Sequence, residues 1–119
     1  MSSQGITGIE RLLKAFGFSM QGVTAAFKNE AAFRQEIYLS LILVPLGIYL
    51  GESGVEKAML VSVIFLVLIT ELINSGMEAV VDRFGGDQHE LSGRAKDVGS
   101  AAVLIALINV LIVWGCVLL

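Results

Sequence analysis

The sequence Glu71-Leu-Ile-Asn-Ser-Gly-Met-Glu-Ala-Val-Val-Asp82 directly follows residues 58–70, which carry no charge. Its positions 71, 74, 75, 78 and 82 recur at helical spacing and share one face of a helix. An ionisable group beside a membrane-length apolar run is costly and is retained mainly where it lines a site or a polar path. For Asp82, a helix that leaves the membrane with its charges wetted is an equal alternative. Glu71 points to a functional site, because mostly apolar residues follow it before the next charge.

The composition is that of a membrane protein. The chain has 119 residues, of which 55% are hydrophobic and 16% are charged, and its mean hydropathy is +0.81. A soluble domain of this length would carry more charge, so we expect one small bundle with no second domain. A net charge of -3, without a basic patch interleaved with aromatic residues, argues against nucleic acid as a partner. The single cysteine, Cys116, excludes an intrachain disulfide.

Hydrophobic spacing predicts an all-α fold. Over about residues 5–28, apolar side chains recur at steps of three and four, which predicts an amphipathic helix lying in the membrane interface. Membrane-spanning helices are expected over about 31–50, 56–84 and 91–119, because about 20 apolar residues suffice to cross. Pro45 predicts a kink in the first of them. The last span also carries small residues suited to close helix contact, at Gly99, Ala102 and Ala106.

The basic residues predict the orientation in the membrane. Most of them precede the first span or lie between the second and third, and only Lys57 lies near the first turn. The positive-inside rule then places the N-terminus and the 83–97 loop in the cytoplasm and the C-terminus outside. Lys57 to Glu71 is a rise of about 21 Å at about 1.5 Å per residue. Glu71 is therefore expected on the cytoplasmic side of the bilayer centre.

Acidic and basic residues gather on that cytoplasmic side. Together they can bind Mg²⁺ and a polyphosphate, since Mg²⁺ typically takes one or two protein carboxylates plus phosphate oxygens. Phosphoryl transfer needs these groups and one that orients the attacking hydroxyl. Residue types alone do not distinguish such a site from ion pairs in a cytoplasmic loop. The sequence has no Walker A motif and no protein-kinase Gly-rich loop, so a kinase here would lie outside the usual soluble classes.

Three segments resemble the bacterial integral-membrane diacylglycerol kinase family. They read Asn29-Glu-Ala-Ala-Phe-Arg-Gln-Glu36, Glu71-Leu-Ile-Asn-Ser-Gly-Met-Glu-Ala-Val-Val-Asp-Arg83 and His89-Glu-Leu-Ser-Gly-Arg-Ala-Lys-Asp-Val-Gly-Ser-Ala-Ala-Val103. The resemblance covers nearly the whole chain. It implies a homotrimer of three-span subunits in the bacterial cytoplasmic (inner) membrane, with active sites shared between neighbours at the cytoplasmic interface. It also implies Mg²⁺-dependent transfer of the ATP γ-phosphoryl group to diacylglycerol, giving phosphatidic acid and ADP.

The resemblance also implies roles for individual residues. Glu71 falls on the general base and Asn74 on the same catalytic face, while Glu30 and Glu78 fall on the metal carboxylates. Contacts with the nucleotide and its metal are implied for Arg11, Phe18, Glu30, Glu78, Asp87, Gln88, His89, Lys96 and Asp97. Contacts with the lipid are implied for Ala15, Ser19, Arg34, Gln35, Glu36, Glu71 and Ser100. Phe18 stands where the family often has tyrosine, so stacking on the adenine is kept and a hydrogen bond is lost.

Three other readings stay open at this point. An undecaprenol kinase of the same fold would use the same catalytic residues, since lipid choice depends on the shape of the groove. A small proton-coupled transporter subunit would also place a carboxylate such as Glu71 in a span, but it would not need Glu30, Lys96 and Asp97 on one side. A purely structural bundle leaves Glu71 unexplained. The run Ala-Phe-Arg-Gln-Glu and the third motif favour diacylglycerol.

Overall fold

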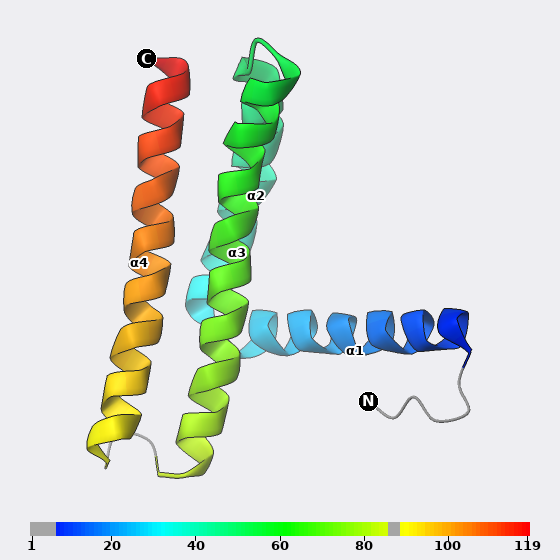
Figure 1. The fold of residues 1–119 in the computed structure, drawn as a ribbon, viewed down its shortest axis with the longest axis vertical. Helices are drawn as coiled ribbons and strands as arrows, with labels where there is room; N and C mark the ends of the chain where they lie inside the picture. Colours follow the sequence, from blue (N-terminus) through cyan, green and yellow to red (C-terminus); the bar gives the residue numbers. More distant parts are fainter. Residues whose placement is uncertain (1–6, 86–88) are drawn as a thin grey trace.

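The described residues form four helices, which confirms the all-α prediction. The computed structural model describes residues 7–85 and 89–119. Its helices are α1 (Gly8–Asn29), α2 (Ala31–Leu50), α3 (Gly54–Arg83) and α4 (Glu90–Leu118). α2, α3 and α4 run alongside one another, while α1 projects sideways from them (Figure 1). The start of the first predicted helix and the predicted nucleotide contacts Asp87 and Gln88 lie outside the described residues.

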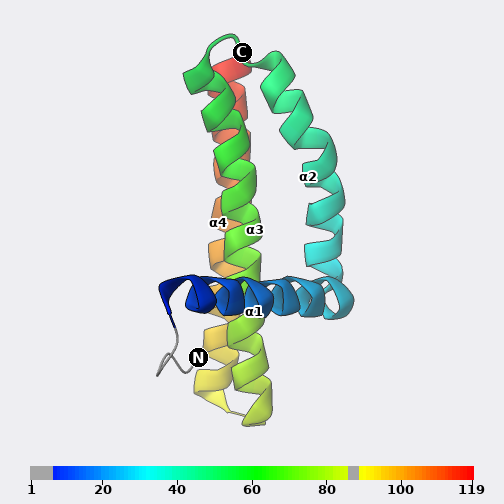
Figure 2. The same ribbon diagram turned by 90° about the vertical axis from the view of Figure 1, so that its right-hand side faces the viewer.

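Local capping chemistry sets where the helices begin. The Thr7 hydroxyl accepts a hydrogen bond from the Glu10 backbone N–H at 3.2 Å, and Ser53 caps α3 in the same way through the Glu56 N–H at 3.1 Å. Such caps satisfy N–H groups that lack a partner in the first turn. Glu30 has extended backbone angles and separates α1 from α2. That single extended residue turns the chain through the corner between α1 and α2 (Figure 2).

α3 is the central helix of the bundle and packs against α4 on one side and α2 on the other. The buried apolar side chains of α3 are Leu60, Val63, Ile64 and Val67. Phe33 of α2, together with Val103 and Ala106 of α4, is also buried. Close van der Waals packing of this kind is a main source of helix association in a membrane.

The helices that run alongside one another are also the apolar ones. α2, α3 and α4 are each long and apolar enough to cross a membrane, as the sequence predicts. Many of their large apolar side chains are exposed in the single chain, where lipid or another protein surface can cover them. α2 continues through Pro45 but changes direction along its length (Figure 2). Proline removes one backbone hydrogen bond and thereby bends a helix.

Two contacts fasten the end of the bundle where α2 joins α3. The Lys57 ammonium donates to the backbone carbonyls of Ile48 at 2.8 Å and Gly51 at 2.6 Å, at the C-terminus of α2. The indole N–H of Trp114 donates to the Leu60 carbonyl at 3.1 Å, which ties α4 to α3. The Lys57 ammonium and the Trp114 indole N–H therefore both have hydrogen-bond partners.

Candidate active site

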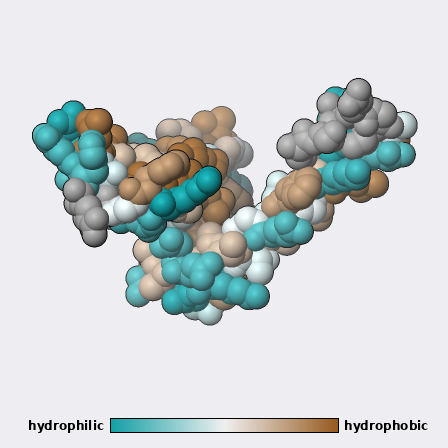
Figure 3. Space-filling view, turned by 90° about the horizontal axis from the view of Figure 1, so that it is seen from below, coloured by the Kyte–Doolittle hydropathy of each residue, from teal (hydrophilic) through white to brown (hydrophobic). Residues whose placement is uncertain are grey.

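A cavity of about 640 Å³ lies between α1 and the second half of α3. Small residues open it, because Gly22 and Ala26 on α1 face Gly76 and Ala79 on α3. Its acidic lining residues are Glu30, Glu78 and Asp82. Seen from the end where α3 finishes and α4 begins, hydrophilic residues lie at several places on the bundle and along the projecting α1 (Figure 3).

Glu71 is the only buried charged side chain among the described residues, with 7% of its surface exposed. The carboxyl groups of Glu36 from α2, Glu30 and Glu78 lie close enough to that of Glu71 to interact with it electrostatically. The fold thus brings four acidic residues from α2, α3 and the α1–α2 junction together. Burying charged groups in this way destabilises a fold unless something compensates.

Asn74 lies one turn after Glu71 on the same face of α3. Its Nδ2 donates a hydrogen bond to Oε1 of Glu78 at 3.1 Å. Its Oδ1, like Oε2 of Glu36, is buried without a hydrogen-bond partner in the part of the chain that the structure describes. Buried polar atoms nearly always have partners in folded proteins. These two unsatisfied oxygens mark the region around Glu71 as unusual.

The acidic residues fit a metal that arrives with a phosphate ligand. Across residues 7–85 and 89–119, no group of three or more His, Cys, Asp or Glu side chains is placed to hold a metal by itself. Glu30 and Glu78, however, come from different helices and line one cavity. Mg²⁺ commonly takes one or two carboxylates and completes its octahedron with water and phosphate oxygens. The two carboxylates match that donor set.

The basic residues of the predicted site have specific partners. Lys96 of α4 forms an ion pair with Asp82 of α3 at 2.6 Å, which joins the two helices beside the cavity. Arg34, predicted to contact lipid, donates to the backbone carbonyls of Phe27 at 2.7 Å and Lys28 at 2.9 Å. A cation at the end of α1 complements the helix dipole there. Arg34 therefore also fixes the corner between α1 and α2.

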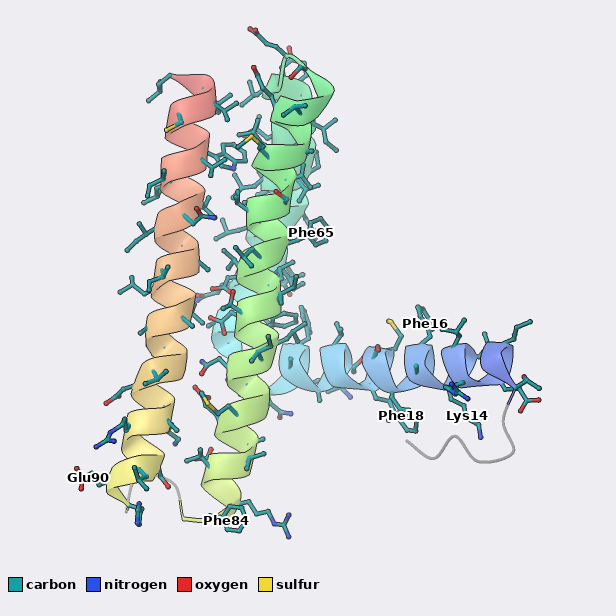
Figure 4. All side chains as sticks on the ribbon, viewed as in Figure 1. Lys14, Phe16, Phe18, Phe65, Phe84 and Glu90 are labelled. Carbon is teal, nitrogen blue, oxygen red and sulfur yellow. The ribbon has the colours of Figure 1, made fainter. Side chains whose placement is uncertain are left out.

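Other predicted residues lie apart from Glu71 in the single chain. Arg11 and Phe18 lie on the arm of α1 that projects away from the bundle, whereas Asp97 and Ser100 are exposed on α4. Phe18 and Lys14 point to one side of α1 and Phe16 to the other (Figure 4). Ser19 lines the cavity, while Ala15 is half-buried on α1 and Gln35 is exposed on α2. One chain thus groups the acidic residues but not all the nucleotide contacts.

Two roles were not foreseen from the sequence. His89 accepts a hydrogen bond at Nδ1 from the Leu91 backbone N–H at 3.0 Å and so caps α4. The small residues that open the cavity were not singled out either. Their spacing of four on α1, Gly22 and Ala26, and of three on α3, Gly76 and Ala79, is the signal that would have found them, because such residues share one helix face.

Comparison with known proteins identifies the family. Residues 17–118 match the family described as prokaryotic diacylglycerol kinase. The chain is 53% identical over 112 residues to the diacylglycerol kinase of Haemophilus influenzae, an alignment that covers 94% of this chain and 95% of that one. It is 52% identical to the Escherichia coli K12 diacylglycerol kinase, covering 95% and 92% of the two chains, and 46% identical to that of Pseudomonas aeruginosa, covering 98% and 94%. The chain belongs to the prokaryotic diacylglycerol kinase family.

Proposed function

We propose that this protein is a lipid kinase of the bacterial inner membrane that transfers the γ-phosphoryl group of ATP to 1,2-diacylglycerol, giving phosphatidic acid and ADP. The observation that carries the proposal is the buried Glu71 carboxyl group, which lies among those of Glu30, Glu36 and Glu78. A chain with no use for a buried carboxylate would gain stability from an apolar residue there. Family membership supplies the reaction class.

Glu71 acts as the general base. Its carboxylate accepts the proton of the diacylglycerol hydroxyl, and the hydroxyl oxygen forms a bond to the γ-phosphorus. The bond between that phosphorus and the β–γ bridging oxygen breaks, and ADP leaves with the electron pair. Proton transfer to a positioned base typically contributes about 10²–10⁴ in rate. Glu71 is buried, which limits the access of water that would compete with the lipid hydroxyl.

Glu30 and Glu78 would hold Mg²⁺ together with the nucleotide phosphates. The bound ion supplies positive charge that offsets the charge on the phosphate oxygens. The proposed nucleotide contacts beyond these two carboxylates lie on α1, between α3 and α4, and on α4, and they are Arg11, Phe18, Asp87, Gln88, His89, Lys96 and Asp97. Lys96 forms an ion pair with Asp82, which lines the cavity, and this supports its place among them.

α1 is proposed to lie in the cytoplasmic interface of the membrane. The side of α1 that carries Phe16 faces the acyl chains, and the opposite side, with Lys14 and Phe18, faces the headgroups and cytoplasm (Figure 4). An apolar side toward the acyl chains and a basic residue on the opposite side are typical of interfacial helices. The lipid glycerol backbone would then reach Glu71 past the proposed lipid contacts, which are Ala15, Ser19, Arg34, Gln35, Glu36 and Ser100.

The active form is proposed to be a homotrimer with shared active sites. Within one chain, Arg11 and Phe18 lie on an arm that projects away from the acidic cluster. α1 makes its packing contacts with α2 and α3, so most of the arm is exposed. A neighbouring subunit would bring such an arm, or its own α4 with Lys96 and Asp97, to the open side of the cavity.

The orientation proposed from the basic residues places the N-terminus and the α3–α4 turn in the cytoplasm and the C-terminus outside. The test uses a background in which Cys116 is replaced by serine. A cysteine introduced at Glu52, in the exposed turn between α2 and α3, should react with an impermeant thiol reagent on intact cells. A cysteine at Glu90 should react only after the cells are opened. Equal labelling of both in intact cells contradicts the orientation and a cytoplasmic site.

The substrate is tested with purified protein in lipid vesicles. Labelled ATP is supplied with diacylglycerol or with undecaprenol, and the labelled lipid product is identified. We expect phosphatidic acid as the main product, because the compared relatives are diacylglycerol kinases. Preferential labelling of undecaprenol would replace the lipid assignment while leaving the kinase chemistry in place. Absence of any labelled lipid would contradict the proposed reaction.

A further inference from the structure

We infer that Gly99 of α4 is a positioning residue for the Mg²⁺-binding carboxylate of Glu78 and that it acts through the amide of Asn74. The inference rests on the proposed function, because it assumes that Glu78 holds the metal. It goes beyond that function by assigning a task to a residue that bears no side chain and touches neither substrate nor metal.

The contact between α3 and α4 beside the cavity is too close for a side chain on α4. A Cβ atom added at Gly99 would overlap Oδ1 of Asn74 and Cε of Met77. Gly99 itself is buried. The Met77 methyl group is the end of a flexible side chain and can move aside. Asn74 is held by its bond to Glu78 and cannot move without losing it.

The chemistry of the two partners fixes which way the amide points. An ionised carboxylate only accepts hydrogen bonds, so Asn74 must present its NH₂ group to Glu78. Its Oδ1 then has to face α4, where it is buried and has no hydrogen-bond partner among the described residues. At Gly99 it meets backbone Cα–H instead, a weak hydrogen-bond donor at close helix contacts. Only glycine leaves room for this arrangement.

The contact at Gly99 lies close to the proposed nucleotide contacts of α4. Gly99 lies less than one helical turn after Lys96 and Asp97, the residues of α4 proposed to contact the nucleotide. The contact of Asn74 with Gly99 therefore links the register of α4, and with it those nucleotide contacts, to the orientation of the Glu78 carboxylate on α3. Altering a residue that hydrogen-bonds to a metal ligand, as Asn74 does to Glu78, typically changes metal affinity about 10–100-fold, and displacing Asn74 from α4 should act in the same way.

The test compares Gly99→Ala with Gly115→Ala on the same helix. A Cβ at Gly115 would meet nothing within 4 Å, so this control reproduces the gain in helix propensity without the overlap. The readout is Mn²⁺ binding, followed by electron paramagnetic resonance, to full-length protein in detergent with a non-hydrolysable ATP analogue. We expect about 10–100-fold weaker Mn²⁺ binding for Gly99→Ala and unchanged binding for Gly115→Ala.

Asn74→Ala, alone and combined with Gly99→Ala, completes a double-mutant cycle. Because Gly99 acts through Asn74, adding Gly99→Ala to Asn74→Ala should weaken Mn²⁺ binding no further, and its effect on the thermal midpoint should largely disappear. An effect of Gly99→Ala that persists in the Asn74→Ala background, or one equal to that of Gly115→Ala, overturns the inference. Glu78→Ala tests the metal assignment separately from the role of Gly99. If this variant binds Mn²⁺ as the parent does, the metal assignment fails and this inference fails with it.

Discussion

The two halves of α3 both pack against α4, but they bury different kinds of side chain. In the half before Glu71, the side chains of Leu60, Val63 and Val67 are buried and apolar, and the Trp114 N–H is paired with a backbone carbonyl. In the half from Glu71 onward, a carboxyl group is buried and the Asn74 Oδ1 has no hydrogen-bond partner among residues 7–85 and 89–119. The first half is consistent with selection for stability. The second departs from that pattern, as functional sites commonly do.

The largest effect is expected for Glu71→Gln. The amide keeps the shape of the side chain but cannot accept the lipid proton, so the rate of phosphoryl transfer should fall about 10²–10⁴-fold while the protein stays folded. Initial rates with diacylglycerol and labelled ATP measure the loss. Glu52→Gln, in an exposed turn, is the matched control and should keep the parent rate. A Glu71→Gln rate within a few-fold of the parent would remove Glu71 as the base.

A somewhat smaller effect, dependent on Mg²⁺, is expected for Glu30→Ala and Glu78→Ala. Each change removes an oxygen ligand, so the Mg²⁺ concentration that gives half-maximal rate should rise about tenfold or more, and added Mg²⁺ should partly restore the rate. The double variant should be little worse than the more damaging single one, because residues that act as a unit are non-additive.

The control for these carboxylates is Glu90→Ala, since Glu90 forms an exposed ion pair with Arg94 at 3.5 Å that contributes little. Rates measured against Mg²⁺ and ATP concentration test whether Glu30 and Glu78 bind the metal. Defects that multiply and do not respond to Mg²⁺ would place Glu30 and Glu78 outside the metal site.

Substitutions in the first half of α3 should change the stability of the protein and not the rate of phosphoryl transfer. Leu60→Ala removes a fully buried side chain and should lower the free energy of unfolding by about 2–5 kcal/mol, with the rate per folded molecule unchanged. Leu66→Ala removes the same atoms from an exposed position of the same helix and should have a much smaller effect. Thermal unfolding in detergent, together with the activity of the folded fraction, tests this. Equal destabilisation by both would show that the core assignment is wrong.

Much of this fold is local in origin and could be predicted. Hydrophobic periodicity and length predicted an all-α chain with three apolar helices that could span a membrane, as found. Spacing also placed Glu71, Asn74 and Glu78 on one face of one helix, because that relation needs only the helical repeat. The family resemblance is confirmed by full-length relatives.

Contacts between helices could not be predicted in the same way. The approach of Glu36 to Glu71, the Asp82–Lys96 ion pair and the Asn74–Gly99 contact depend on the register of one helix against another, which no local spacing fixes. The capping bonds of Arg34 depend on the corner at Glu30. The family resemblance implied a contact with lipid for Arg34, and nothing in the sequence predicted that its side chain caps the end of α1.

The most direct test of the difference between the two halves is the thermal midpoint of Glu71→Leu in detergent. Leucine fills a similar volume and removes a buried carboxylate from a group of four, so it should relieve desolvation and mutual repulsion. The account predicts a midpoint equal to or above that of the parent, with lipid phosphorylation abolished. A midpoint lowered as far as that of Leu60→Ala would contradict it, because Glu71 would then be holding the bundle together.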